Sequence, residues 1–170
     1  MRSEAGRTRT APARGSGPAQ LRVAVASCQQ SEHGYYAPRH MLEDDLDQVV
    51  HVGDYIYERS WGSSLVRQHG APECYTLGDC RARYALYRMD RDLQGAHAAY
   101  PWMVTWNDHE VDNDYANDTS EENDDPALFL AGRPPTRLIA STFRFRGVRC
   151  RPDRICGCIA PRRSAESSTC

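Results

Sequence analysis

Two acidic segments of this sequence have residue types and a spacing that suit metal chemistry. Asp54 follows Gly53 at the end of an apolar run, and the phenol of Tyr57 stands three residues further on. A carboxylate in this position can bridge two cations, because hard cations prefer oxygen ligands. The alternative is that Asp54 merely caps the turn after Gly53. Asp54 and Tyr57 are therefore candidate metal ligands.

The second segment places Asp108 and His109 next to each other, again directly after an apolar run. Asp108 could complete an oxygen-rich cation site. His109 has the pKa range needed to give a proton to a leaving oxygen or to hydrogen-bond a phosphoryl oxygen. The alternative for His109 is an ordinary surface histidine in a polar loop. Asp108 is therefore a third candidate ligand, and His109 is a candidate proton donor.

Two further features could bind metal. Cys28 ends a third apolar run, and a thiolate can bind iron or zinc, although a lone cysteine is often just a small buried apolar residue. Residues 107–125 are dense in Asp, Asn and Glu, which predicts a hydrated loop rather than a packed element. The carboxylates of this loop could bind calcium or could simply be solvated. They are Asp112, Asp114, Asp118, Glu121 and Glu122.

The elements that would position these residues begin with a β-α-β pattern. Residues 21–26 and 48–52 have the apolar, β-branched composition of strands, and 39–47 resembles a short helix between them. Such a unit implies parallel strands whose carboxyl ends lie side by side. Residues 60–75 are polar and contain glycine, which indicates a long loop.

A second helical region and a third strand follow. Thr76 and Asp79 approximate a capping box at the start of a helix that runs to Arg88, and a short helix is expected over 90–99. Residues 102–106 are a third strand candidate. These elements predict an α/β fold in which the candidate ligands gather beyond the strand ends, where ligands bind in such sheets.

Composition limits the classes of protein to which this chain could belong. All 21 basic residues are Arg and form no evident patch, so specific binding to nucleic acid is not expected. No apolar run reaches the roughly 18 residues that a membrane span needs. Four of the seven cysteines lie close to the end of the sequence, away from its patterned part, so a disulfide framework is not expected.

The two ends of the sequence differ from its middle. Residues 1–20 contain Arg, Ala, Gly and Pro without an apolar segment, which predicts a disordered leader with no visible secretory signal. Residues 133–170 contain nine Arg and four Cys with no period of a helix or strand. This pattern predicts a disordered tail or, on a sharper interpretation, out-of-frame translation. One domain is expected between the two ends, over residues 21–132.

Four blocks of residues carry a resemblance to a known family. They are Ala26-Ser27-Cys28-Gln29-Gln30, Val52-Gly53-Asp54-Tyr55-Ile56-Tyr57-Glu58, Arg83-Tyr84-Ala85-Leu86-Tyr87 and Thr105-Trp106-Asn107-Asp108-His109-Glu110-Val111-Asp112-Asn113. Together they closely resemble the alkaline phosphatase D family of calcineurin-like metallophosphoesterases. The resemblance implies part of a four-layer α/β/β/α sandwich. It also implies that small-molecule phosphate mono- and diesters are hydrolysed by a metal-bound hydroxide.

The same resemblance assigns roles to the candidate residues. It implies ferric iron (Fe3+) and calcium (Ca2+), with Cys28, Asp54 and Tyr57 holding the iron and Asp54 bridging to the calcium. Asp108 matches a metal ligand of the wider superfamily, and His109 matches its proton donor and phosphate-contacting histidine. No residue is assigned to substrate binding. A secreted, extracytoplasmic location, reached by the twin-arginine route, is implied by the resemblance alone.

The sequence departs from the family in two places. Asn107 stands where the family usually has Asp, which is expected to affect the loop rather than ligation. The family's later Gly-Asp-x-His block has no counterpart, because no Asp-x-His occurs after Asp108. The chain is therefore expected to expose a sheet edge and an apolar face, to fold poorly and to be largely inactive.

Two alternatives compete with the hydrolase. A non-catalytic fragment could bind calcium through its acidic loop. Such a fragment would lack the charge-transfer colour that iron bound through Cys28 and Tyr57 produces. A zinc module around Cys156-Gly157-Cys158 is a weaker alternative, because it lacks the usual two-residue spacing between ligands.

Overall fold

The computed structural model describes most of the middle of the chain. The described residues are 6–7, 13, 15–17, 20–34, 37–116 and 119–121. The predicted tail over 133–170, the zinc alternative within it and most of the predicted leader over 1–20 lie outside these residues. Asp118 and Glu122 of the acidic loop also lie outside them.

A parallel three-stranded sheet forms the centre of the described structure. The strands are β1 (Val23–Ala26), β2 (Gln48–Val52) and β3 (Trp102–Thr105), in the order β1-β2-β3. Both pairs of neighbours are parallel. All three predicted strands are confirmed to within two residues at each end, and so is the α/β class. Because the strands are parallel and adjacent, their carboxyl ends meet at one edge of the sheet.

Two of the three predicted helices are also confirmed. Helix α2 covers Leu77–Tyr87 and α3 covers Arg91–Ala99. The predicted capping box is present at α2, where the backbone N–H of Asp79 donates to Thr76 Oγ1 (3.2 Å) and the N–H of Thr76 donates to Asp79 Oδ2 (2.8 Å). Residues 60–75 form neither helix nor strand, as predicted.

The first predicted helix, over 39–47, is wrong in its bounds. Helix α1 covers only Ala37–Met41, after a 3-10 turn at Ser31–His33. The hydroxyl of Tyr100 donates to the carbonyls of Met41 (2.9 Å) and Asp44 (2.6 Å). These are carbonyls that a longer helix would use for its own hydrogen bonds, so a contact from the end of α3 terminates α1.

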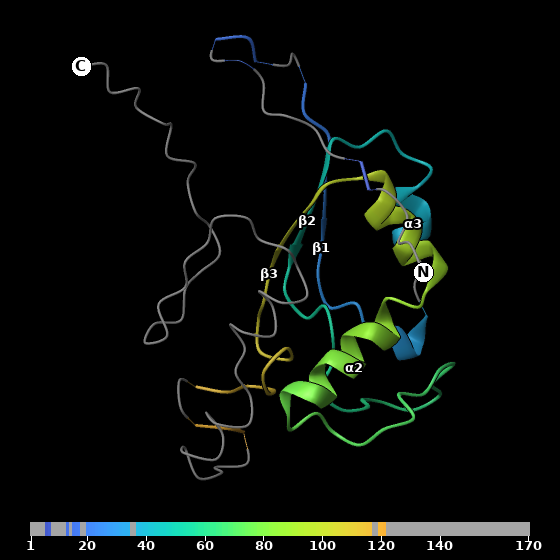
Figure 1. Cartoon of the computed structure of the whole chain (residues 1–170), viewed down its shortest axis with the longest axis vertical. Coiled ribbons are helices and arrows are strands. Elements are labelled where there is room, and N and C mark those ends of the chain that lie inside the picture. Colours follow the sequence, from blue (N-terminus) through green and yellow to red (C-terminus); the bar gives the residue numbers. More distant parts are fainter. Residues whose placement is uncertain are drawn as a thin grey trace, which may run out of the picture.

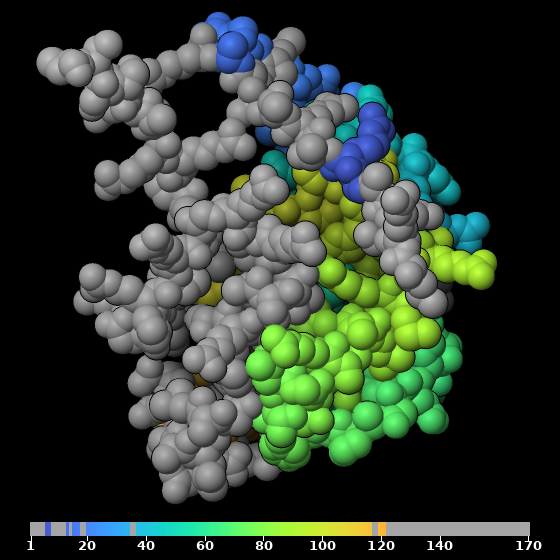
Figure 2. Space-filling view, viewed as in Figure 1, coloured from blue at the N-terminus to red at the C-terminus, as the bar shows by residue number. Residues whose placement is uncertain are grey.

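All three helices lie on one face of the sheet (Figure 1). Val49 and His51 of β2 point to that face and are fully buried. Two clusters of buried side chains fill the layer between sheet and helices. One contains Tyr55, Ile56, Cys74, Cys80, Tyr84, Tyr87 and Leu93, and the other contains Met41, Val49 and Tyr100. Figure 2 shows the chain around α2, in green, as one continuous surface.

The opposite face of the sheet is apolar and exposed. Val25 of β1 is 68% exposed, Val52 of β2 is 47% exposed and Met103 of β3 is 49% exposed. These residues alternate with the buried ones along the strands, as the pleat of a sheet requires. The expectation of an exposed apolar face is therefore confirmed. No described helix is long and apolar enough to cross a membrane.

The acidic loop that follows β3 is packed where the sequence predicted a hydrated segment. Glu110 and Val111 are each 3% exposed, and Asp112 is 6% exposed. Two backbone hydrogen bonds turn the loop inward, because the N–H groups of Val111 and Asp112 both donate to the carbonyl of Asp108 (2.7 and 2.8 Å). The prediction was wrong for these residues because polar composition does not reveal where a carboxylate finds a buried donor.

Candidate metal centre

The ends of β2 and β3 approach each other closely at Gly53. A Cβ atom added to Gly53 would lie 2.5 Å from the Cβ of Asn107, which follows β3. Gly53 also has a φ of 110°, a conformation that other residues rarely adopt. A residue with a side chain would therefore push apart the two loops that carry Asp54 and Asp108.

Two candidate ligands have backbone conformations that are unusual for residues with a side chain. Cys28 has a φ of 53° and Asp54 a φ of 56°, both in the left-handed region. Past the strands the two segments still pair, because the N–H of Cys28 donates to the carbonyl of Gly53 (3.2 Å). Cys28 Sγ then lies 3.3 Å from Asp54 Oδ2. Strained conformations of this kind cluster at functional sites.

Three of the candidate residues offer ligand atoms to one small volume. Asp54, Asp108 and His109 each have a ligand atom within 4.8 Å of the others. Asp54 is 6% exposed, and its buried Oδ1 accepts no hydrogen bond from the described residues. Since buried carboxylate oxygens are almost always satisfied, this oxygen suits a cation. The carboxylates and the imidazole of this group therefore fit metal binding, and the Cys28 thiol lies outside the group.

The pKa values of Tyr57 and Cys28 are both raised. Burial raises the pKa of the Tyr57 phenol well above its usual value, and the charges of Asp54 and Cys28 raise it further. The hydrogen bond with Ser27 lowers the pKa of the Cys28 thiol, but burial and Asp54 outweigh it and raise the pKa. Potential anions crowd one another here, and a bound cation would reverse both shifts.

His109 contacts a buried carboxylate that no sequence pattern indicates. Its Nδ1 lies 2.8 Å from Oε2 of Glu58, whose side chain is 2% exposed. Burial lowers the pKa of His109, but the hydrogen bond and charge of Glu58, with the charges of Asp54 and Asp108, outweigh burial and raise it. The ring of His109 also packs 4.1 Å from that of Tyr57, between centroids.

Glu110 ties the two ligand loops together. Its Oε2 accepts hydrogen bonds from the backbone N–H groups of Asp54 (3.2 Å) and Asn107 (2.9 Å), and its Oε1 accepts from the N–H of Tyr55 (2.5 Å). Burial raises the pKa of Glu110 to about 7. Glu58 and Glu110 belong to the family-like blocks, but no spacing rule in the sequence gives either carboxylate a role.

Asp108 is oriented by its own loop. The N–H of Asp114 donates to Asp108 Oδ2 (2.8 Å), and the amide of Asn107 donates to Oδ1 (2.7 Å). Burial raises the pKa of Asp108, but backbone hydrogen bonds, that of Asp114 first, and the charge of His109 outweigh burial and lower it. Asn107 thus takes part in loop structure, as its departure from the family pattern led us to expect.

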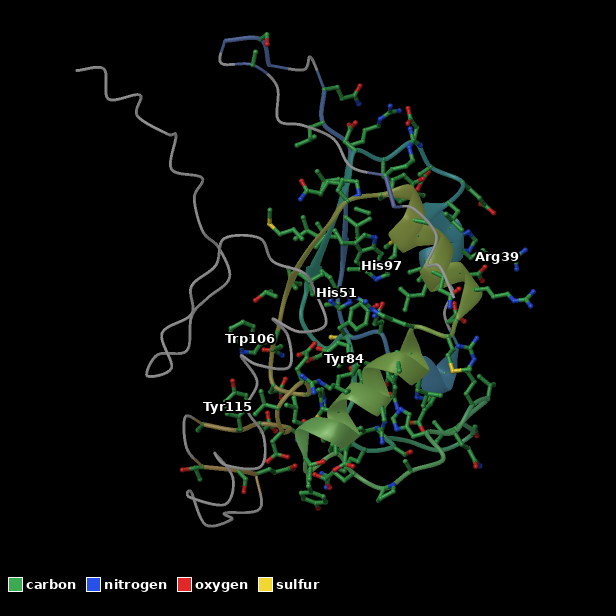
Figure 3. The ribbon with its side chains drawn as sticks, in the orientation of Figure 1. Arg39, His51, Tyr84, His97, Trp106 and Tyr115 are labelled. Carbon is green, nitrogen blue, oxygen red and sulfur yellow. The ribbon has the colours of Figure 1, made fainter. Side chains whose placement is uncertain are left out.

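The described carboxylates of the acidic run lie outside this centre. Asp112 accepts a hydrogen bond from the N–H of Glu121 (3.3 Å), and Glu121 pairs with Arg59 (3.0 Å). Within the described part of the chain, the carboxylates that converge with His109 are those of Asp54 and Asp108. Figure 3 shows His51 and Tyr84 in the layer between sheet and helices, which we call the aromatic layer. Trp106 lies directly after β3.

Comparisons with known proteins give three concordant results. The family model described as PhoD-like phosphatase matches residues 23–134. Alkaline phosphatase D of Bacillus subtilis (strain 168) is 48% identical over 137 residues, covering 77% of this chain and 24% of that protein. The solved "Structure of PhoD" is similar with a TM-score of 0.75 and 44% identity, covering 81% of this chain and 28% of that one. The chain thus spans about a quarter of the length of these relatives, and the resemblance seen in the motifs is confirmed.

Proposed function

Because the chain belongs to the PhoD-like phosphatase family, we propose that it contributes one part of a metal centre that hydrolyses small phosphate mono- and diesters. The observation that carries this proposal is the convergence of Asp54, Asp108 and His109 within 4.8 Å, beside a buried carboxylate oxygen of Asp54 that accepts no hydrogen bond from the described residues. Anionic phosphate esters bind and react where cations neutralise their charge.

We assign two cations to these donors. Fe3+ would be held by the thiol of Cys28, a carboxylate oxygen of Asp54 and the phenol of Tyr57. Asp54 and Asp108 would hold Ca2+. When bound, the cations supply Lewis acidity that activates water and neutralises charge on the phosphoryl group. The 3.3 Å contact of Cys28 with Asp54 and the coupling of their charges to Tyr57 support this division.

His109 supplies the proton. Its contact with the carboxylate of Glu58 favours the imidazolium form, from which the ring can donate to a phosphoryl or leaving-group oxygen. The contact of Nδ1 with Glu58 fixes the ring orientation and makes Nε2 the nitrogen that faces the reaction. Glu58 acts through His109 and is therefore a positioning residue.

The exposed face of the sheet suggests how the family fold would be completed. Val25, Val52 and Met103 would pack against the second sheet of an α/β/β/α sandwich. We therefore propose that the 170-residue chain alone hydrolyses a nitrophenyl phosphodiester only weakly. Ordinary turnover by the purified chain would contradict this proposal. An extracytoplasmic location is proposed on family resemblance, and fractionation of the source cells would test it.

Metal analysis of the purified chain tests the centre itself. After incubation with Fe3+ and Ca2+, we expect bound iron and a visible tyrosinate charge-transfer band. Tyr57→Phe should abolish the band. Tyr75→Phe is the matched control, because Tyr75 is 51% exposed and its hydroxyl donates to Glu73. Calcium binding without iron would contradict the proposed centre and favour a calcium-binding fragment.

A further inference from the structure

Two side chains of α2 hold the backbone of Tyr57 from both sides. The N–H of Tyr57 donates to the hydroxyl of Tyr87 (3.2 Å), and Nη1 of Arg83 donates to the carbonyl of Tyr57 (2.6 Å). Arg83 and Tyr87 stand four residues apart, so they lie on the same face of α2, one turn from each other. Both are buried, with 3% and 1% exposure.

Arg83 makes mainly backbone contacts. Its Nη1 also reaches the carbonyl of Glu58 (3.1 Å), and its Nη2 reaches the carbonyl of Pro72 (2.9 Å). The N–H of Cys74 donates to the same Glu58 carbonyl (2.9 Å). A guanidinium used in this way fixes the path of the chain, because its rigid fork of donors holds several carbonyls at once.

His69 connects the two side chains. Burial lowers the pKa of His69 to about 4, and the charge of Arg83 adds to this effect, so the ring is neutral near pH 7. Its Nδ1 accepts from Arg83 Nη1 (2.6 Å), which leaves the proton on Nε2, 3.1 Å from the hydroxyl of Tyr87. The Tyr87 oxygen has two lone pairs and can therefore accept from both His69 and the N–H of Tyr57.

We propose that Arg83 and Tyr87 are positioning residues that aim the side chains of Tyr57 and Glu58 into the metal centre. This inference rests on the proposed function. Tyr57 turns its phenol towards Asp54 and Cys28, while Glu58 turns its carboxylate to His109. One helical turn of α2 thus orients both a proposed iron ligand and the partner of the proton donor.

The hydrogen bonds of Arg83 and Tyr87 to the backbone of Tyr57 are called the clamp below. Hydrogen exchange of the Tyr57 amide in the metal-free chain tests the clamp without relying on the metal. Tyr87→Phe removes the acceptor and should speed this exchange about tenfold, the loss expected for one hydrogen bond. The control is Tyr100→Phe, because the Tyr100 hydroxyl is also hydrogen-bonded to backbone, sharing its proton between the carbonyls of Met41 and Asp44. It should leave Tyr57 exchange unchanged. Equal exchange in both variants would overturn the proposal.

The spectrum of the iron-loaded chain tests whether the clamp aims the phenol. Arg83→Met removes every donor and should shift the tyrosinate band or reduce its intensity, as should Tyr87→Phe. Arg81→Met is the control, since Arg81 is exposed on the same helix. Should Arg83→Met fail to fold, Tyr87→Phe still decides. A band unchanged in Tyr87→Phe would overturn the aiming role. Absence of the band from the unsubstituted chain would count against the iron site alone, because amide exchange tests the clamp separately.

Discussion

Two histidines of this chain, one half-buried and one fully buried, have opposite pKa shifts. His109, at the end of the sheet, contacts Glu58 and has a raised pKa. His51, in the layer between sheet and helices, is fully buried, neither ring nitrogen has a hydrogen-bond partner among the described residues, and burial lowers its pKa to about 4. Its neighbours are the rings of Tyr55 and Trp102, at 5.2 and 6.2 Å between centroids.

The opposite pKa shifts of His109 and His51 show that a neighbouring carboxylate, and not burial alone, sets the protonation state of a histidine. Burial lowers the pKa of both rings because it removes water from the charged form. At His109 the carboxylates overcome this effect, and at His51 nothing does. The carboxylates at the end of the sheet thus favour a charged ring at His109, whereas the surroundings of His51 favour a neutral one.

Among the substitutions considered, removal of the Glu110 carboxylate should lower the free energy of unfolding most. Glu110→Ala removes the acceptor of three N–H groups, those of Asp54, Tyr55 and Asn107, of which the first two make buried hydrogen bonds. Each such loss costs about 1–3 kcal/mol, so we expect the free energy of unfolding to fall by about 3–5 kcal/mol. Chemical denaturation measures the change, with the exposed Glu43→Ala as control. A loss equal to that of Glu43→Ala would refute the role given to Glu110.

Acid should destabilise the chain through the aromatic layer. The folded pKa of His51 is about 4, below its ordinary 6.5, so the unfolded state binds the proton more readily. The contribution of neutral His51 is complete above about pH 6.5 and falls by about 3 kcal/mol as the pH drops to 4. His51→Leu should remove this part of the loss. Denaturation of both proteins at pH 7 and pH 4.5 measures it, and parallel pH profiles would contradict the assignment.

Substitution of Glu58 should bring the pKa of His109 closer to that of His51. In the metal-free chain, Glu58→Gln removes the charge but keeps a hydrogen-bond acceptor near Nδ1 of His109. Because burial then faces less opposition, the pKa of His109 should fall while that of His51 stays unchanged. Titration followed by NMR of the two rings measures both. An unchanged pKa at His109 would mean that Asp54 and Asp108, rather than Glu58, hold the proton.

The smallest effect is expected where a substitution touches neither region. Thr76→Ala removes the side-chain cap of α2, which should cost about 1 kcal/mol. Since the side chain of Thr76 contacts Asp79 and neither histidine, the pKa values of His51 and His109 should keep their opposite shifts. Denaturation and the same NMR titration check this outcome. Loss of either shift would show that helix stability, not local partners, sets the contrast.

Sequence patterns predicted helices and strands well where the residues that stabilise the element are close together in the chain. The capping box of α2 needs only Thr76 and Asp79, and the strand over 48–52 needs only its β-branched run. The prediction for 39–47 failed because Tyr100, more than fifty residues away, takes the carbonyls at the end of α1. The packing of Glu110 was missed for the same reason, since its donors include Asp54 and Tyr55 from another loop.

Residue types and order were enough to identify the family, the parallel sheet and the convergence of Asp54 and Asp108, because parallel neighbours must end on the same side. Folding in three dimensions determined which groups hold those residues in place. Glu58, Arg83 and Glu110 act across contacts between segments that are far apart in the chain. A protonation state or a ligand's orientation depends on such neighbours, and no period or spacing along the chain encodes them.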